Sequence, residues 1–192
     1  RSLSSAASDV YKRQVRVQGR ISQGVSGMKL SGNDKVIGMI VTDDFDTSVL
    51  TISKYGMAKR SRLGSGEMLP LTESGTPIVD ESGDQIFERD GYRKTNRGTK
   101  GVRTMSLRDG DEIVSVRQIP DLDDQLFMLT GSGMMIRMVS GQTKETLGKV
   151  TKGTRIMELR NRDRTGYEDE IVFVARLPSE LISTGETLEE EE

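Results

Sequence analysis

The sequence contains no cysteine and no histidine among its 192 residues, and aromatic residues make up only 4% of it. Without cysteine the chain can form no disulfide and no thiolate zinc site, and without histidine it lacks the commonest metal ligand and general base. Catalysis by a Ser–His or Cys–His pair is therefore excluded. Since aromatics are scarce and methionine supplies much of the apolar share, we expect a core of aliphatic and small residues.

Long apolar runs are also missing. No segment approaches the roughly 18 consecutive apolar residues of a membrane span, and no apolar segment carries the positive flank of a secretion signal. We therefore expect a soluble, cytoplasmic chain without a membrane partner. Its length fits one domain or two small ones.

The two ends of the sequence differ from its middle. Residues 1–14, "RSLSSAASDVYKRQ", show neither strand alternation nor a helical stripe, and they resemble translated sequencing-adaptor sequence. We expect a non-native or disordered leader there. Residues 184–192 are dominated by glutamate, which predicts a disordered acidic tail.

The middle of the chain is built from repeats. "GVSGMKLSGNDKVIGMI" begins at Gly24, "GVRTMSLRDGDEIVSVR" at Gly101, and a looser copy, "GTRIMELRNRDRTGYEDEIVFVA", at Gly153. The first two copies also share a later hairpin pattern, "VLTISKYGMAKR" and "LFMLTGSGMMIR". The spacing from Gly24 to Gly56 equals the spacing from Gly101 to Gly133, which indicates an internal repeat rather than chance.

Each repeat is predicted to be β-structure. "KVIGMIV" and "EIVSVRQI" are short β-branched runs, "SVLTI" and "QLFML" form the next strands, and "MAKR" and "MMIR" return. Gly56 and Gly133 supply the positive φ of a tight hairpin between them. Four short strands per repeat predict an all-β, propeller-like array of four-stranded blades, and two to three blades cannot close a ring.

An acidic insertion separates the first unit from the second. It covers residues 63–91, where seven Asp and Glu face a single Arg. By contrast, residues 92–160 contain 13 Lys and Arg against 8 Asp and Glu. The net charge of −2 therefore hides a basic body with acidic appendages.

The most basic stretch is "YRKTNRGTKGVRTMSLR", residues 92–108, which holds six cationic side chains and no acidic one. Cations on an exposed ridge gain affinity for duplex DNA by releasing counterions, and this needs no helix that reads the bases. Glycines in the stretch allow the backbone to approach closely. Similar cations recur after the first hairpin and before the third repeat, which predicts a basic path along successive blades.

These motifs resemble the C-terminal domain of the DNA gyrase A subunit. The resemblance rests on "YGMAKR" (Tyr55 to Arg60), "YRKTNRGTKGV" (Tyr92 to Val102) and "DKVIG" (Asp34 to Gly38). It implies the last two to three blades of a β-pinwheel whose blades exchange strands and which wraps DNA around a basic rim. The family's gyrase box, Q-R-R-G-G-K-G, is absent, and "TNRGTKG" and "KVTKGTR" are only degenerate counterparts of it.

The predicted domain is an incomplete β-pinwheel over residues 15–183. Its blades are expected at about 15–62, 92–140 and 141–183. Eleven cations are predicted to contact DNA phosphates: Lys59, Arg60, Arg62, Arg93, Lys94, Arg97, Lys100, Arg103, Lys149, Lys152 and Arg155. No catalytic or metal-binding residue is predicted. Tyr92 is interpreted as a packing residue, and the repeated Asp34, Asp111 and Asp169 as caps of turns.

The resemblance also implies a parent enzyme. That parent would be an ATP-dependent, Mg2+-dependent type II topoisomerase in the bacterial cytoplasm, associated with the nucleoid. It would be a heterotetramer of gyrase A and gyrase B subunits, in which DNA wrapping by this domain favours negative supercoiling. No cofactor is expected in this chain itself. Two alternatives stay open: the related domain of the topoisomerase IV A subunit, and a protein-binding propeller.

Overall fold

The computed structural model describes residues 15, 17–146, 151–159 and 169–182. Two hairpins lie at its centre, as the sequence predicts. β1 (Ser48–Ser53) and β2 (Met57–Arg62) form the first, and β8 (Gln125–Thr130) and β9 (Met135–Val139) form the second. Gly56 and Gly133 turn them with φ of 79° and 83°, which confirms the predicted hairpin glycines.

Each hairpin is extended by a strand from the following repeat. β7 (Ile113–Ile119) pairs antiparallel with β1, and β11 (Ile171–Leu177) pairs antiparallel with β8. The registers are equivalent, because Ile119 faces Ser48 just as Leu177 faces Gln125. β10 (Thr154–Arg155) adds to β2, so the first sheet has the order β10-β2-β1-β7 and the second the order β11-β8-β9.

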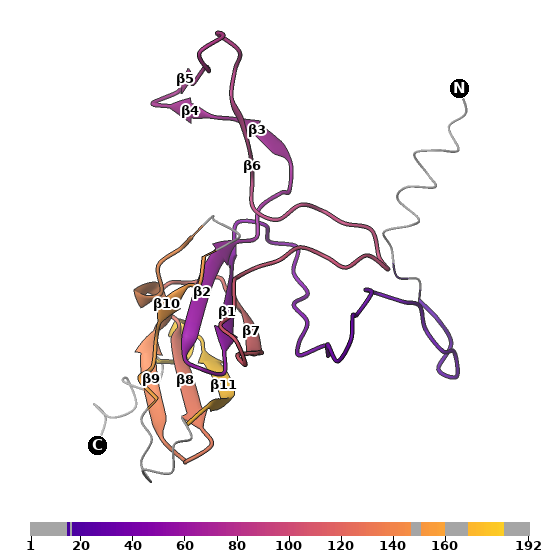
Figure 1. Ribbon diagram of the computed structural model, residues 1–192, viewed down its shortest axis with the longest axis vertical. Coiled ribbons are helices and arrows are strands. Elements are labelled where there is room, and N and C mark those ends of the chain that lie inside the picture. Colours follow the sequence, from indigo (N-terminus) through magenta and orange to yellow (C-terminus); the bar gives the residue numbers. More distant parts are fainter. Residues whose placement is uncertain (1–14, 16, 147–150, 160–168, 183–192) are drawn as a thin grey trace.

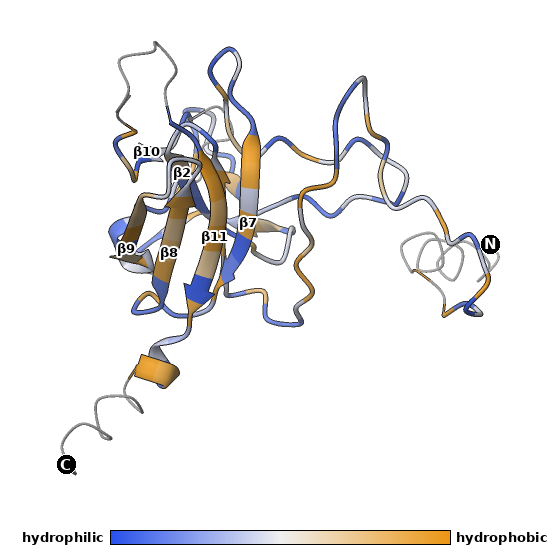
Figure 2. Cartoon of the chain, turned by 90° about the horizontal axis from the view of Figure 1, so that it is seen from below, coloured by the Kyte–Doolittle hydropathy of each residue, from blue (hydrophilic) through white to orange (hydrophobic). Residues whose placement is uncertain are grey.

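The two sheets pack against each other around one aliphatic core (Figure 1). Figure 2 shows the apolar stretches of β7, β8 and β11 side by side. In the part of the chain that the structure describes, the core cluster contains no aromatic residue, in agreement with the composition; its buried members are Leu50, Ile52, Ala58, Ile119, Leu126, Met128, Ile171 and Val174. The fold is thus an all-β, propeller-like arrangement, and the sheets of the described residues do not close into a ring.

Two of the three repeated aspartates, Asp111 and Asp169, fasten one repeat to the hairpin of the repeat before it. Asp111 Oδ1 accepts hydrogen bonds from the backbone N–H groups of Tyr55 (3.1 Å) and Glu112 (2.9 Å). Asp169 Oδ1 does the same for Ser132 (3.1 Å) and Glu170 (2.9 Å). The predicted role as turn caps is confirmed for Asp111 and Asp169, and the turn that each one caps belongs to the preceding hairpin. Asp34 instead accepts a hydrogen bond from the nearby Ser31 N–H at 3.3 Å.

The predicted strand "KVIGMIV" does not form. Residues 36–42 hold the place in the repeat that β7 holds in the next unit, but no hairpin precedes them among the described residues. Val36, Met39 and Val41 are therefore 65%, 83% and 80% exposed. A strand needs a neighbour to satisfy its backbone groups, and the sequence pattern alone could not show that no described strand pairs with residues 36–42.

The acidic insertion forms a separate projection (Figure 1). β3 (Met68–Pro70) pairs with β6 (Phe87–Arg89), and β4 (Thr72–Glu73) pairs with β5 (Thr76–Pro77). We call residues 63–91 the acidic arm. A short 3-10 turn, η1 (Ser140–Gln142), follows β9, and residues 179–182 are helical. Within the described residues, no helix is long and apolar enough to cross a membrane.

Candidate nucleic-acid interface

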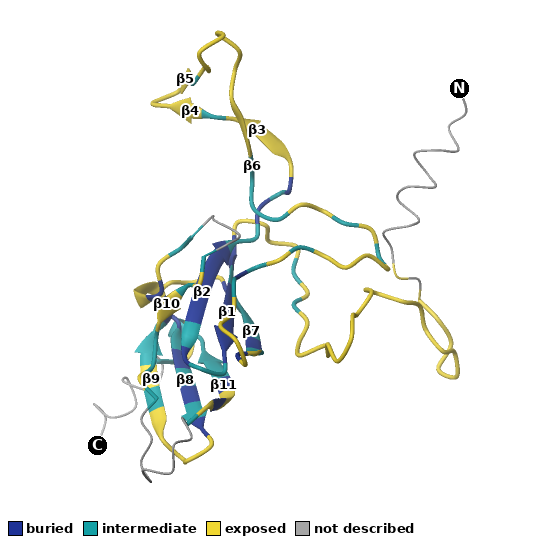
Figure 3. Cartoon of the chain, in the orientation of Figure 1, coloured by how far each residue is buried: buried dark blue, intermediate teal, exposed yellow. Residues whose placement is uncertain are grey.

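The basic strip, residues 92–108, runs as an exposed loop from the base of the acidic arm toward β7 (Figure 3). Its two sides are tied together where the Tyr92 hydroxyl and Thr104 Oγ1 lie 2.5 Å apart. Tyr92 is half-buried, and its N–H donates to Leu63 O at 2.9 Å. These contacts agree with a structural role for this tyrosine.

The tip of the strip is held by the N-terminal segment. Gly98 turns the chain with a φ of 74°, and its N–H donates to Gly27 O at 2.8 Å. Lys29 N–H donates to Thr99 O at 2.9 Å, so the two segments run beside each other. Backbone hydrogen bonds therefore fix the tip of the loop, while several of its side chains stay exposed to solvent.

Four of the predicted contact residues in the strip are exposed: Arg93, Lys94, Lys100 and Arg103. Arg97 is half-buried. The Lys94 ammonium lies 5.4 Å from the centre of the Phe45 ring, which is close enough for a cation–π contact. The strip thus presents several cations on one loop without acidic neighbours in its own sequence.

A second basic segment lies directly beside the strip. Ser106 N–H donates to Thr151 O at 3.0 Å, which joins the strip to residues 151–155. Arg155 lies opposite Met57 in the β10–β2 pair, and a guanidinium nitrogen of Arg108 lies 3.6 Å from the sulfur of the same Met57. Arg108, which belongs to the strip but not to the predicted contact residues, therefore connects the two groups of cations.

We call this combined area the joined basic surface. Its exposed cations are Arg93, Lys94, Lys100, Arg103, Arg108, Lys152 and Arg155. Lys149 lies outside the described residues. The predicted recurrence of cations on neighbouring segments thus becomes a physical adjacency, because a backbone hydrogen bond holds the segments together.

Lys59 and Arg60 are buried and do not belong to this exposed surface. Lys59 is 2% exposed, and its ammonium donates to Thr104 O at 2.6 Å. Burial lowers the pKa of this lysine, since the charged form loses hydration. The predicted phosphate contact does not fit either residue, because both charged groups already lie inside the protein.

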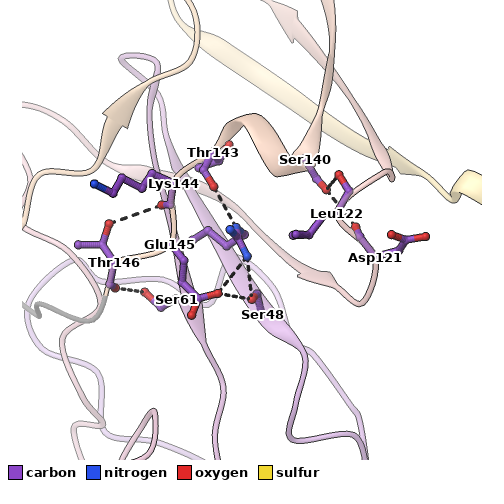
Figure 4. Close-up of polar contacts among 10 residues, drawn as sticks. Ser48, Ser61, Asp121, Leu122, Ser140, Thr143, Lys144, Glu145 and Thr146 are labelled. Carbon is purple, nitrogen blue, oxygen red and sulfur yellow. Dashed lines mark hydrogen bonds and ion pairs between the residues drawn. The ribbon is translucent and has the colours of Figure 1, made fainter. Parts of the chain in front are cut away.

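The Arg60 guanidinium is the centre of a buried network. Its Nε donates to Thr143 O at 2.9 Å, and one terminal nitrogen reaches Glu145 Oε2 at 2.9 Å and Ser48 Oγ at 3.3 Å. Figure 4 shows Ser48, Thr143 and Glu145 gathered around this point. Thr146 N–H also donates to Arg60 O. The network fastens the first hairpin to the chain that follows the second, and sequence reasoning did not identify it.

Arg62 is half-buried and already paired. It lies 2.7 Å from Asp46 and 3.0 Å from Asp90, at the base of the acidic arm. A backbone hydrogen bond from Ser65, together with Arg62, holds the pKa of Asp90 below its usual value. With its charge matched by two carboxylates, Arg62 adds less to a phosphate-binding surface than the strip does.

Chemistry other than binding has little support in this site. Among the described residues, no group of three or more Asp, Glu, His or Cys could hold a metal ion. The strip contains cations, small polar residues and glycines, and it lacks the paired carboxylates or histidines of general acid–base catalysis. The arrangement suits an extended anionic ligand.

The fold and the joined basic surface together define a β-propeller-type repeat domain. A family model described as "DNA gyrase C-terminal domain, beta-propeller" matches residues 13–43, 86–120 and 124–165, more than half of the chain. The chain belongs to this family.

Individual proteins agree with the family. The chain is 30% identical over 169 residues to the DNA gyrase A subunit of Campylobacter jejuni, and 29% identical over 167 residues to that of Helicobacter pylori strain J99. These matches cover 87% and 86% of this chain but only 16% of each relative. The chain therefore spans about a sixth of the length of these relatives.

Solved structures show the same fold. A DNA gyrase A C-terminal domain matches with a TM-score of 0.59 at 22% identity, covering 85% of this chain and 44% of that one. The Escherichia coli ParC C-terminal domain matches with a TM-score of 0.50 at 17% identity, covering 79% and 49%. Of these two, the gyrase domain covers more of the chain at the higher score.

Proposed function

We propose that this chain is the DNA-binding and DNA-wrapping part of a gyrase A protein. The observation that carries the proposal is the joined basic surface, in which the hydrogen bond between Ser106 and Thr151 joins the C-terminal end of the basic strip to a second cationic segment. A duplex carries a phosphate charge about every 1.7 Å of axis, so adjacent cationic segments fit its backbone without reading its sequence. Family membership supports the same ligand.

Bending the duplex requires several segments to act together. Smooth bending of a 20 to 30 bp site by 40 to 90 degrees costs about 1 to 6 kcal/mol. A single loop with a few phosphate contacts offsets little of that cost after its own ordering. Two segments joined by a backbone hydrogen bond give a longer contact line than one loop alone, which is what wrapping needs.

The role in a whole enzyme follows from the relatives. We propose a parent type II topoisomerase that uses ATP and Mg2+, assembled from gyrase A and gyrase B proteins in the bacterial cytoplasm, where wrapping directs strand passage toward negative supercoils. Those reactions are assigned to parts of the parent outside this chain, and no residue described here is assigned to ATP or Mg2+.

The test compares two variants of equal charge. The first removes three exposed cations from the strip: Arg93→Ala, Lys100→Ala and Arg103→Ala. The second removes three exposed cations from other places: Arg20→Ala, Arg137→Ala and Lys144→Ala. Duplex affinity is measured from 50 to about 300 mM salt for both variants and for the parental chain.

We expect the strip variant to bind duplexes of any sequence more weakly and to lose about 3 from the slope of log affinity against log salt. The second variant should keep a slope within about 1 of the parental value. If the strip variant stays folded and keeps its slope, the strip is only a solvated surface. A parental chain without salt-dependent duplex binding would favour a protein-binding propeller.

A further inference from the structure

The acidic arm leaves the fold at a defined point of the repeat. Up to Gly64 the chain makes the same backbone hydrogen bonds as the next unit: Leu63 N–H donates to Thr47 O, and Gly64 N–H donates to Phe45 O. The equivalent bonds run from Ser140 to Asp124 and from Gly141 to Leu122. After Gly64 the paths separate, and the arm returns to Tyr92, where the basic strip begins.

The base of the arm is closely packed. A Cβ at Gly64 would lie 2.5 Å from the Asp90 carbonyl, and one at Gly91 would lie 2.1 Å from Leu63 O. Ser65 N–H donates to Asp90 Oδ2 at 2.7 Å, and Asp90 also pairs with Arg62 at the end of β2. These contacts fix the direction in which the arm leaves the sheet.

The outer part of the arm is also folded. Beyond the β3–β6 pair, three passes of the chain bond to one another: Leu71 N–H to Ile86 O, Ile78 N–H to Leu71 O, and Ile86 N–H to Ile78 O. Asp80 Oδ1 accepts from the N–H groups of Ser82 and Asp84 and closes the last turn. The arm therefore has a shape of its own, and Figure 3 shows that most of it is exposed.

The charge of the arm is opposite to that of the strip it adjoins. Its carboxylates outnumber its single cation by seven to one, and that cation, Arg89, donates to Gly66 O within the arm. Glu88 lines a hollow of about 230 Å³ together with Arg62 and Tyr92, beside the first residue of the strip. Glu81 and Asp84 lie at the far turn.

We infer that the acidic arm is a boundary for bound DNA, one that deflects a duplex on the joined basic surface away from the arm and so fixes the side on which the duplex leaves. The inference rests on the proposed function, since it needs a duplex on that surface. Phosphates are repelled by carboxylates, and the repulsion between exposed charges decays over a Debye length of about 10 Å at 0.1 M salt. Carboxylates near the base of the arm must therefore act more strongly than those at its tip.

That gradient supplies a matched control. The base variant carries Glu67→Gln and Glu88→Gln, and the tip variant carries Glu81→Gln and Asp84→Asn, so each removes two exposed negative charges. In a shortened variant an Asn-Gly turn replaces residues 71–86 and joins Pro70 to Phe87, which already lie opposite each other. Duplex affinity is measured for the full chain at 50 mM and 300 mM salt, with circular dichroism as the check of folding.

We expect the base variant to bind duplex about threefold more tightly than the parental chain at 50 mM salt, with the gain disappearing near 300 mM. The tip variant should stay within about 1.5-fold at both salt concentrations. The shortened arm should also bind more tightly, because it removes most of the physical obstacle, although the carboxylates at the base remain.

The outcomes separate this inference from the proposed function. If the parental chain binds duplex and the strip variant does not, but the base variant is unchanged or weaker, the boundary is overturned while the proposed function stands. Equal gains in the base and tip variants would also overturn it, since they would reflect net charge alone. If the parental chain binds no duplex at all, both ideas are overturned.

Discussion

The substitution Arg60→Ala tests whether Arg60 stabilises the fold or contacts DNA. The substitution removes hydrogen bonds to Thr143 O and Ser48 Oγ and the ion pair with Glu145. Removal of one partner from a fully buried ion pair costs about 3 to 5 kcal/mol. The Glu145 side chain is 36% exposed, so water can replace part of its lost contact. Thr143 O has no such access, because Thr143 is fully buried.

We therefore expect Arg60→Ala to lower the free energy of unfolding by about 2 to 3 kcal/mol. For a chain of this size that corresponds to a fall in Tm of about 4 to 12 °C. Urea unfolding followed by circular dichroism gives the value directly. A double-mutant cycle with Glu145→Gln then isolates the ion pair from the hydrogen bond to Thr143.

Arg137 is the matched control, because it holds the same place in the second hairpin. It is exposed, with Gln125 and the Phe127 ring as its neighbours. Arg137→Ala should therefore cost less than about 1 kcal/mol. Arg60→Ala should leave the salt slope of duplex binding unchanged. A variant as stable as the parental chain but with a reduced slope would refute the assignment of Arg60 to the interior.

Three further predictions concern Lys59, Asp111 and two glycines. Burial lowers the pKa of Lys59, so with rising pH the folded protein releases this proton before the unfolded chain does. The urea midpoint of the parental chain should therefore rise relative to that of Lys59→Met as the pH increases toward 10.5. Parallel pH profiles of the two midpoints would contradict this. Asp111→Ala removes the hydrogen-bond acceptor of two backbone N–H groups and should lower the free energy of unfolding in urea by about 1 to 2 kcal/mol. Asp111→Asn should lower it less, because it keeps an oxygen acceptor. Gly153 and Gly133 share a positive φ, but a Cβ at Gly153 would lie 2.3 Å from Ala58 O, whereas one at Gly133 would meet nothing within 4 Å. Gly153→Ala should therefore lower Tm clearly more than Gly133→Ala. Equal falls in Tm would argue against the close approach of Gly153 to Ala58.

The hairpins were predictable from sequence because their signals are local. Short β-branched runs and a glycine with positive φ lie within a dozen residues of one another, and both hairpins formed where expected. The partner of each edge strand depends on residues far away in the chain. The pattern at residues 36–42 resembles β7 closely, yet only β7 has a hairpin to pair with among the residues that the structure describes.

The burial of Lys59 and Arg60 has the same cause. Thr104, Thr143 and Glu145 surround these side chains, and they lie 45 to 85 residues further along the chain. One feature of the sequence did indicate that this position is buried: the second hairpin carries Ile136 at the position where the first carries Lys59. An apolar residue at an equivalent position indicates an interior site more reliably than the charge of a single copy does.

The joining of Ser106 to Thr151 could not be read from the sequence either. The repeat predicted that cations recur, but recurrence does not give distance between neighbouring segments. That distance is set by β10, which brings residues 151–155 onto the edge of β2, beside the end of the strip. The candidate site therefore depends on a two-residue strand that no propensity would have marked.

The late arrival of β10 has a consequence during synthesis of the chain. β10 follows β2 by about 90 residues, so at typical elongation rates of 5 to 20 residues per second the free edge of β2 waits about 5 to 20 s for its partner. An open strand edge at that stage can pair with another nascent chain. Lys59, Arg60 and Arg62 give β2 three positive charges during this interval. We therefore expect the cations that end in the interior or in ion pairs to reduce pairing of the newly made hairpin with other chains before the sheet is complete.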